Sequence, residues 1–537
     1  MAIPPGLTET EFSRALKEFA GVIGKEWVFS SKEDVDLYRD PYSPFWSEDG
    51  ERIPGAALAP DSVEQIQGIV RIANRYKIPL WTVSTGRNLS YGGASPAMSG
   101  TVILDLKRMN RVLEVNDKTY YAVVEPGVSY FDLYNYIQEH KLNVWMDPPD
   151  PGWGSPMGNS LDRGGGRTPM RDHFGAVCGL EVVLANGEVL RTGMGAMPNS
   201  AVWHQYKYGF GPYLDGIFTQ SNYGIVTRMG VFLMPAPEAY RDGRVSVYRH
   251  DDLIPFMHNY SRLMNSGVLR GTMMLESPIL NYKVSTGRAV FDMPGDPSVE
   301  ELERIGREKD LPYWSAEFRY WGSPKIVDAQ WEETRDKFGE IPGVKFTDGR
   351  YYKLPEDVSK SDPDPVIQGS LGIPSLGVFE LIQGAAGHMG FSPIIPMTGE
   401  AIFKALRVFG ELYTELGLTP KNQFAALPWS YYPRALVFLF GISTFKDVQQ
   451  NQKNREIFKR MVEVSAENGW GEYRTHVAFM DTVAESYSFN NHIMRRFNET
   501  VKDAIDPNGI LAPGKSGIWP KRLRKDRPEG TGLKFED

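Results

Sequence analysis

Residues 509–516, GILAPGKS, match the pattern G-x-x-x-x-G-K-[ST], which grips phosphate groups in enzymes that hydrolyse nucleotides. Such a loop follows a buried strand and opens a helix, because the helix N-terminus supplies the amides that hold the phosphates. Here an amphipathic helix is predicted before the motif, at 486–505, and Gly517 and Pro520 stand where the following helix should begin. The order of elements is inverted, so nucleotide hydrolysis is not predicted.

A second glycine-rich stretch, STGRNLSYGGASP at 84–96, directly follows a strand candidate at 80–83. Gly86, Gly92 and Gly93 would allow a ligand to approach the backbone closely and would expose N–H donors to it. Taken alone, such a loop is more often a surface turn. Its interpretation therefore depends on the rest of the chain.

The chain has a single cysteine, Cys178, which excludes an internal disulfide and suits a reducing compartment. Because its neighbours predict a strand and turn, we interpret it as a buried core thiol rather than a nucleophile. The basic run KRLRK at 521–525 is either a solvated end or a subunit contact. A net charge of −8 and a pI near 5.7 argue against a nucleic-acid partner.

The chain begins without a basic region followed by an apolar run, so no secretory signal is predicted. No apolar run approaches the ~18 residues that would span a bilayer. We therefore expect a cytoplasmic protein without a membrane segment. Its 537 residues suit a large enzyme of two or three domains.

The predicted secondary-structure elements that would position these residues follow different patterns in the first and the later parts of the chain. Up to about Pro235, strand candidates and glycine-rich loops alternate with helices, one of which opens with Ser62 and Gln65 as a capping box. From about 240 to 500, helical stretches alternate with apolar strands, a pattern typical of an α+β domain with an antiparallel sheet. Besides 80–83, the clearest candidates are strands at 101–106 and 435–443 and helices at 131–139, 299–309 and 400–417.

Several sequence blocks together resemble those of a known family. In these blocks the chain resembles the 4-phenol-oxidising flavoproteins, the family of vanillyl-alcohol oxidase, eugenol oxidase and the p-cresol methylhydroxylase (PCMH) flavin subunit. The blocks are STGRNLSYGG (84–93), EPGVSYFDL (125–133), DPPDPGWGSPMGNSLDRG (147–164), GLEVVLANGEVLRTGMGAMP (179–198), FTQSNYGIVTRMG (218–230), GHMGFSP (387–393), GEYRTHVAFMD (471–481) and DPNGILAPGKSGIW (506–519).

The resemblance implies an α+β, two-domain flavoprotein. Its PCMH-type FAD-binding domain would be formed by both chain ends, and a cap domain with a large antiparallel sheet would lie between them. We therefore predict the FAD-binding domain at 1–240, the cap domain at 241–500, and a C-terminal segment at 501–537 that returns to the FAD-binding domain.

The resemblance also assigns the glycine-rich loop to FAD. His388, in GHMGFSP, matches the histidine that the oxidases of this family join covalently to FAD, whereas the methylhydroxylase branch uses a tyrosine. The other expected FAD contacts are Ser84, Thr85, Gly86, Arg87, Asn88, Gly92, Gly93, Pro126, Gly127, Gly158, Asn159, Gly224, Ile225, Arg474 and Lys515.

The same resemblance implies how a substrate would bind. Tyr91, Tyr473 and Arg474 match the family's phenol-binding trio. An arginine that stays charged, together with two hydroxyl donors, favours the phenolate form of a phenol, whose ordinary pKa is about 10. The phenolate would release a hydride from its para substituent to flavin N5, which leaves a p-quinone methide. Asp150 matches the family's aspartate beside N5 and would act as a general base.

Two positions depart from the family pattern. Arg167, in RGGGRTPMR, stands where the family usually has a tyrosine, and the cap segment PWSYYPRALVFLF carries Arg434 where Met-His-His is usual. We expect both arginines in the substrate pocket, where they could bind an anionic group such as a carboxylate. The alternative is that Arg167 pairs with a nearby acid such as Asp172.

The expected function is oxidation of para-substituted phenols, namely 4-alkylphenols, 4-hydroxybenzylic alcohols and eugenol-like allylphenols, with O2 reduced to hydrogen peroxide. A dehydrogenase or hydroxylase that passes electrons to a cytochrome or another acceptor is the main alternative. An inactive flavin-binding protein and an oxidase of lactate or sugar acids are further alternatives. We expect no metal site and a homo-oligomer, either a dimer or an octamer.

Overall fold

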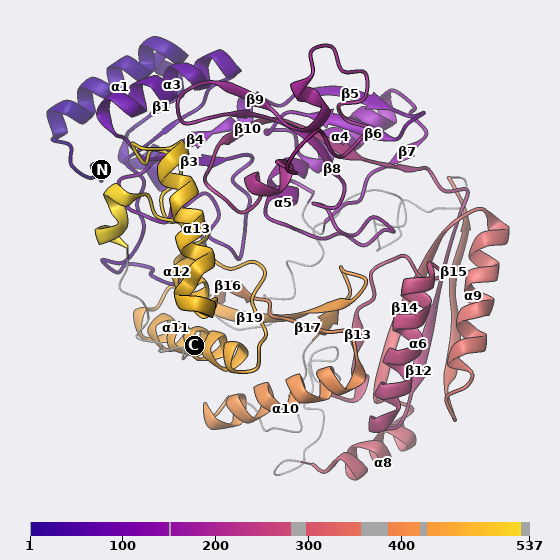
Figure 1. The fold of residues 1–537 in the computed structure, drawn as a ribbon. Helices are drawn as coiled ribbons and strands as arrows, with labels where there is room; N and C mark the ends of the chain where they lie inside the picture. The colour runs from indigo at the N-terminus through magenta and orange to yellow at the C-terminus, as the bar shows by residue number, and fades with distance from the viewer. Residues whose placement is uncertain (1, 150–151, 281–296, 356–384, 419–426, 528–537) are drawn as a thin grey trace.

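The computed structural model describes residues 2–149, 152–280, 297–355, 385–418 and 427–527. In Figure 1 the N-terminal elements, from α1 (Glu9–Ile23) to β10 (Ile225–Phe232), form the upper part of the molecule. The elements from β12 (Ala239–Val247) to α11 (Val448–Glu467) lie below them, and we call this part the cap. The C-terminal elements return to the N-terminal part, and together they make up what we call the base.

One half of the base is a four-stranded sheet in the order β1-β2-β4-β3. Strands β2, β4 and β3 run parallel, and β1 is antiparallel. Ser62 accepts the amide of Gln65 at the start of α3, which confirms the predicted helix and its N-cap. The side chain of Gln65 accepts the amide of Asp61 rather than that of Ser62, so the second bond of the predicted capping box is not formed. The bounds are β1 (Val28–Phe29), β2 (Ala56–Leu58), α3 (Val63–Tyr76), β3 (Leu80–Val83) and β4 (Val102–Asp105).

The other half of the base is a five-stranded antiparallel sheet in the order β5-β6-β10-β8-β9. Cys178 is fully buried in β8, and burial raises the pKa of its thiol to about 12. This confirms the interpretation of Cys178 as a core residue, because the thiolate is the reactive form. The bounds are β5 (Val112–Asn116), β6 (Tyr121–Val124), α4 (Tyr130–Glu139), α5 (Pro156–Leu161), β8 (Val177–Val183) and β9 (Val189–Arg191).

The cap is antiparallel, as predicted, but its described strands form two sheets rather than one large sheet. One has the order β13-β14-β12-β15, and the other has the order β16-β19-β17, with β18 also paired to β19. The bounds are α6 (Leu253–Ser266), β13 (Leu275–Glu276), α8 (Val299–Lys309), β14 (Trp314–Gly322), α9 (Pro324–Phe338), β15 (Lys345–Lys353), β16 (Ala385–Phe391), β17 (Ile394–Pro396), α10 (Gly399–Glu415), β18 (Leu427–Trp429) and β19 (Ala435–Phe445).

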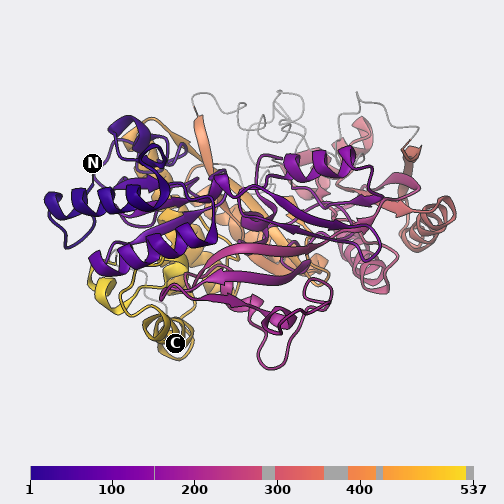
Figure 2. The ribbon, with the colours of Figure 1, turned by 90° about the horizontal axis from the view of Figure 1, so that it is seen from above.

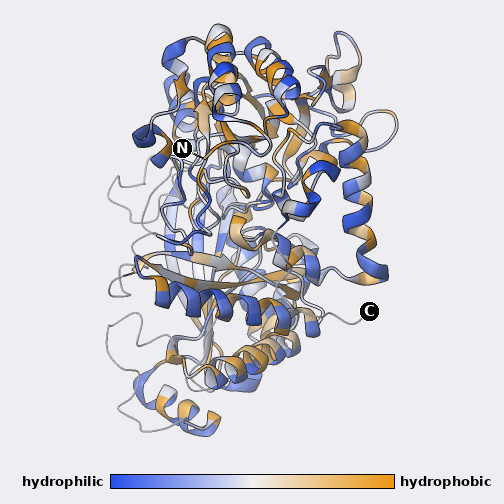
Figure 3. Cartoon of the chain, turned by 90° about the vertical axis from the view of Figure 1, so that its left-hand side faces the viewer, coloured by the Kyte–Doolittle hydropathy of each residue, from blue (hydrophilic) through white to orange (hydrophobic). Residues whose placement is uncertain are grey.

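A single cluster of buried side chains joins the two cap sheets. It contains Phe318 of β14 and Met389 of β16, together with Phe409 of α10 and Phe458 of α11. The helices around this core carry hydrophilic residues on one side and hydrophobic residues on the other (Figure 3). The shared core therefore fixes the strands of the second sheet, which face the base, relative to the rest of the cap.

The C-terminal segment packs beside the first sheet of the base. After α12 (Met480–Ser486) and α13 (Phe489–Ile505), the Leu80 amide of β3 donates to the Ile510 carbonyl over 2.6 Å, and the Ala512 amide donates to the Leu80 carbonyl over 2.7 Å. Figures 1 and 2 both show these C-terminal elements beside the N-terminal ones. The segment GILAPGKS thus pairs with the edge strand β3 and is followed by the short 3-10 turn Lys515–Gly517. A helix precedes the motif and, in the described part of the chain, no long helix follows it directly, which confirms that the order of elements is the reverse of that in a nucleotide-binding loop.

The basic run at 521–525 packs against its own chain. Arg524 forms ion pairs with Glu499 and Asp503 of α13, at 3.0 and 2.6 Å. A wholly solvated end is therefore the wrong interpretation for this arginine. Within the described ranges, no helix combines the length and the apolar character required to cross a membrane.

Candidate active site

A cavity of about 690 Å³ lies where the base meets the cap. This volume is in the upper half of the range typical of pockets for cofactors and small molecules. The base supplies the loop after β3 and the turns around α5 and before β10. The cap supplies β16, β18 and β19, and the loop at 473–480 closes the remaining side.

The glycine-rich loop after β3 lines the cavity from Ser84 to Tyr91. Gly86 and Gly92 have φ of +67° and +109°, in the region that favours glycine. Gly92 does not line the cavity. A Cβ on it would lie 2.4 Å from Cγ1 of Val477, so its small size lets the loop at 473–480 pack directly against the glycine-rich loop.

Contacts between these two loops bring the predicted trio together. The Val477 amide donates to the carbonyl of Tyr91 over 3.1 Å. The guanidinium of Arg474 lies 4.0 Å from the centre of the Tyr91 ring, and its Nη2 donates to Oδ1 of Asn88. Tyr91, Tyr473 and Arg474 all line the cavity.

Arg474 brings a positive charge to the cavity wall without a paired carboxylate. It forms no ion pair with an acid in the described part of the chain, and its Nε is buried without a hydrogen-bond partner there. Burial would lower the pKa of the guanidinium, but its interactions with Tyr91 and Asp162 outweigh burial and raise the pKa. Arg474 therefore stays charged, and its Nε–H is available to an anionic or polar ligand.

The neighbouring tyrosine, Tyr473, remains a proton donor at any ordinary pH. Burial, followed by the influence of Tyr91, raises its pKa well above the usual value of 10. Its backbone carbonyl accepts the side-chain amide of Gln220 over 2.8 Å, and Gln220 has a strained φ of +45°. Gln220 lines the cavity and was not predicted from the sequence, although it lies within the block FTQSNYG.

His388 lies in β16 and lines the cavity beside the glycine-rich loop. Its Nε2 is 2.6 Å from Oγ of Ser90, and its ring centre is 6.0 Å from that of Tyr42. Burial, with a contribution from His476, lowers the pKa of His388 to about 4. The imidazole is therefore neutral at neutral pH, which is the nucleophilic form.

Lys515 lines the cavity, and its charge is already paired. Its Nζ lies 2.7 Å from Oδ1 of Asp162, which also lines the cavity. Burial would raise the pKa of Asp162, but Lys515 and Arg474 lower it below its usual range. Asp162 is a second site residue that the sequence analysis missed.

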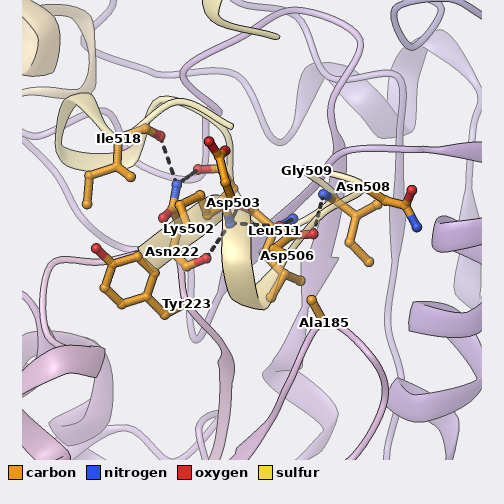
Figure 4. A network of polar contacts seen from close by, with 12 residues as sticks. Ala185, Asn222, Tyr223, Lys502, Asp503, Asp506, Asn508, Gly509, Leu511 and Ile518 are labelled. Carbon is orange, nitrogen blue, oxygen red and sulfur yellow. Dashed lines mark hydrogen bonds and ion pairs between the residues drawn. The ribbon is translucent and has the colours of Figure 1, made fainter. Parts of the chain in front are cut away.

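A buried lysine holds two of the lining segments in place (Figure 4). Lys502 of α13 has a side chain with no exposed surface, and its Nζ lies 2.8 Å from Oδ2 of Asp506. The same nitrogen donates to the carbonyls of Asn222 and Leu511 over 2.5 and 2.7 Å, and both of these residues line the cavity. Asp506 accepts the amides of Ile510 and Leu511, so one ion pair supports the wall on both sides.

Aromatic side chains of the cap cover the end of the cavity nearest Gly165. The rings of Trp429 and Tyr431 are stacked, with centres 5.6 Å apart, and both residues line the cavity. The guanidinium of Arg167 lies 5.4 Å from the centre of the Trp429 ring, and Arg167 itself does not line the cavity. Arg434 is exposed and also lies outside the lining.

Most of the residues predicted for the site thus meet at one cavity. Asp150 lies outside the described residues, although its neighbour Pro149 lines the cavity. Gly127 packs against backbone atoms of residues 106 and 107, and Ile225 belongs to the hydrophobic core of the base. The predicted residues that do line the cavity are Ser84, Thr85, Gly86, Arg87, Asn88, Tyr91, Gly93, Pro126, Gly158, Asn159, Gly224, His388, Tyr473, Arg474 and Lys515.

The chemistry of the lining fits FAD. Within the described ranges, Ser221 Oγ and Asn222 Oδ1 are buried without hydrogen-bond partners, as is Nε of Arg474, and all three residues line the cavity. Buried polar atoms of this kind need a polar ligand, because leaving them unpaired costs about 1–3 kcal/mol each. No group of three metal-ligating side chains occurs among the residues that the structure describes.

Comparison with known proteins agrees with this geometry. A family described as "FAD binding domain" matches residues 54–193, and one described as "FAD linked oxidases, C-terminal domain" matches residues 384–516. The chain is 33% identical over 522 residues to the 4-cresol dehydrogenase [hydroxylating] flavoprotein subunit of Pseudomonas putida, which covers 96% of this chain and 97% of that protein.

Two further similarities concern a solved structure and a partial match. The structure of 4-ethylphenol oxidase from Gulosibacter chungangensis, in complex with isoeugenol, is 37% identical with a TM-score of 0.83, and the match covers 97% of this chain and 100% of that one. The 1'-carboxy-chondrochloren decarboxylase of Chondromyces crocatus is 42% identical over 190 residues, which are 35% of this chain and 34% of that protein.

Proposed function

Because the chain belongs to the family of FAD-linked flavoproteins that includes the 4-cresol dehydrogenase flavoprotein subunit, we propose that it oxidises para-substituted phenols and passes the electrons to O2. It is an FAD-dependent oxidoreductase with the two-domain fold of the PCMH-type flavoproteins. The observation that carries the proposal is the joint cavity, in which Arg474, without an ion-pair partner among the described residues, lies beside Tyr91 and Tyr473.

In the proposed reaction, Arg474 binds the phenol oxygen and stabilises it as phenolate. Tyr473, which keeps its proton, donates a second hydrogen bond to the same oxygen, and Tyr91 supplies the third contact. The phenolate favours loss of a hydride from the benzylic carbon of the para substituent, and FAD, when bound, would supply the acceptor. Trp429 and Tyr431 exclude water from this end of the cavity. Asp150 remains our prediction for the general base that takes a proton from the substrate or from water.

We propose that the glycine-rich loop, the turns before β8 and β10, and Lys515 hold FAD, and that His388 is joined to it covalently. The neutral, buried imidazole of His388 in the cavity wall supports this assignment. Acid precipitation of the purified protein tests it. Yellow colour is expected to stay with the pellet, and colour that passes entirely into the supernatant would exclude a covalent link.

The acceptor is tested by supplying 4-ethylphenol, vanillyl alcohol and eugenol with O2 as the sole oxidant. An oxidase forms about one hydrogen peroxide per substrate oxidised, whereas a dehydrogenase turns over only when a cytochrome or an artificial acceptor is added. The relative named 4-cresol dehydrogenase supports a dehydrogenase as the alternative, whereas the histidine at position 388 favours an oxidase. Absence of peroxide together with rapid reduction of an added acceptor would reject the oxidase proposal.

We further propose that the preferred substrates carry an anionic group that Arg167 recognises. Arg167 lies against the cavity-lining Trp429, and a partial relative is named for a carboxylated substrate. Arg167→Tyr is expected to lower kcat/KM for a 4-alkylphenol bearing a carboxylate by about tenfold, because the positive charge beside Trp429 that attracts the carboxylate is lost. The matched uncharged 4-alkylphenol is the control and should change little. Equal effects on both substrates would contradict this role.

Homo-oligomer formation, as a dimer or an octamer, remains a proposal, as does a cytoplasmic location. On the part of α13 that follows its non-helical residues 490–492, Ile493 and Phe497 are exposed apolar residues four positions apart, and they support a protein contact on this helix. Light scattering of the purified chain distinguishes a monomer from these assemblies.

A further inference from the structure

Ser90 combines backbone strain with a contact to His388. Its φ is +72°, in the left-handed region that non-glycine residues rarely adopt and that costs free energy for an L-amino acid. The side chain is buried, and its Oγ lies 2.6 Å from Nε2 of His388, a residue 298 positions further along the chain. In addition, the Ser90 carbonyl accepts the amide of Gly390, two residues after His388 in β16.

These contacts tie the glycine-rich loop to the strand that carries His388. Strained backbone that persists beside a functional group indicates a role for the residue that bears it. A neutral imidazole has one donor nitrogen and one acceptor nitrogen, and the partner of one nitrogen sets the state of the other. Because a serine hydroxyl can donate to Nε2 or accept from it, the contact fits either tautomer, and what it restrains is the plane of the His388 ring and the position of its nitrogens.

We propose that Ser90 is the positioning residue for covalent attachment of the flavin to His388. This inference rests on the proposed function, in which FAD occupies the cavity. In the attachment, a nitrogen lone pair of His388 forms a bond to a methyl carbon of the flavin ring. The methyl group and the imidazole each lose one proton, the electron pair enters the flavin, and O2 removes that pair as hydrogen peroxide. Ser90 orients the nitrogen for this step and does not itself react.

The test uses full-length protein from riboflavin-limited cells, to which FAD is added, and follows flavin that stays with acid-precipitated protein. Ser90→Ala and Ser90→Gly are expected to slow attachment by about ten- to a hundredfold, the range seen when the orienting hydrogen-bond partner of a metal-bound histidine is removed. Ser90→Gly is the sharper variant, because glycine relieves the strained φ. Ser99→Ala removes another serine hydroxyl outside the cavity lining and should attach flavin at the wild-type rate.

A folding role for Ser90 is separated in a His388→Ala background, where no covalent bond can form. Adding Ser90→Gly to His388→Ala should leave the Kd for FAD unchanged within about twofold. A tenfold weaker Kd in the double variant would overturn the inference, because Ser90 would then hold the loop rather than the imidazole. Wild-type attachment rates in Ser90→Gly would overturn it as well.

Wild-type protein that binds FAD without a covalent bond would also overturn the inference. The proposed function is measured separately in the same samples. The absorbance of oxidised flavin is followed after 4-ethylphenol is added, and its loss shows that the phenol reduces the flavin. A protein that is reduced by the phenol but shows no covalent flavin would retain the proposed function and lose only the role of Ser90.

Discussion

Arg474→Ala is expected to lower kcat/KM for 4-alkylphenols by about a thousandfold, or about 4 kcal/mol of transition-state stabilisation. Arg474 is the only member of the trio with a permanent charge, and it forms no ion pair in the described part of the chain that could be redirected to the substrate. Without it, neither of the two remaining members of the trio carries a positive charge that could stabilise the phenolate in this buried site. Both substrate binding and hydride release should suffer.

Arg474→Lys should recover only part of this loss. A lysine keeps the charge but loses the planar group that stacks on Tyr91 and donates to Asn88. Arg71→Ala, at an exposed position on α3, is the matched control and should leave kcat/KM unchanged. The variants are compared by steady-state kinetics after their flavin spectra have shown that FAD is bound. If kcat/KM of Arg474→Ala stayed within tenfold of the wild-type value, the proposal that Arg474 stabilises the phenolate would be contradicted.

Lys502→Ala is expected to destabilise the FAD-loaded protein by about 3–5 kcal/mol, because it leaves the carboxylate of Asp506 buried without its partner. It also leaves the carbonyls of Asn222 and Leu511 without their donor. Since Asn222 and Leu511 line the cavity, the affinity for FAD should fall together with stability. The loss is large for a single substitution, because the ion pair has no exposed surface that water could reach.

Lys459→Ala provides the matched control. Lys459 forms an ion pair of the same length, 2.8 Å, with Glu456 on the surface of α11, where such a pair contributes about 0–1 kcal/mol. The midpoint of denaturant unfolding and the Kd for FAD are measured for both variants. If Lys502→Ala and Lys459→Ala shifted the midpoint equally, the network in Figure 4 would not support the cavity wall.

Local patterns in the sequence predicted individual elements well. Helix α3 follows from a capping residue and apolar residues at helical spacing, and strand β3 follows from an apolar run after Pro79. The same reasoning rejected GILAPGKS as a nucleotide loop, because the order of neighbouring elements is a local property. The placement of Lys515 beside Asp162, by contrast, joins residues 353 positions apart, and no local pattern specifies it.

The candidate site could be predicted only because several separate sequence blocks together resemble those of one protein family. Arg474, Tyr91 and His388 come from three separate regions, and packing of the base against the cap brings them to one cavity. Side-chain direction was the weak point of the prediction. Arg434 stands just before β19 and is exposed outside the cavity lining, and the composition of its segment does not specify which side chains face the cavity.

Ser90 shows what the sequence could not indicate. Ser90 lies within a sequence block that was already assigned to FAD, but its left-handed backbone conformation and its contact with His388 depend on the position of β16. Gln220 is similar, because its strained backbone and its contact with the Tyr473 carbonyl arise from tertiary packing. Residues whose contacts depend on tertiary packing were therefore missed, whereas several residues of strong chemical character were correctly placed at the cavity.

The phenolate mechanism is tested most directly by mixing the FAD-loaded protein with 4-ethylphenol in the absence of O2 and following the flavin absorbance. The matched compound is 4-ethylanisole, in which a methyl ether replaces the phenol hydroxyl and no phenolate can form. We expect the phenol to bleach the flavin and the ether to leave it oxidised. Reduction by both compounds at similar rates would contradict activation of the substrate as a phenolate by Arg474, Tyr473 and Tyr91.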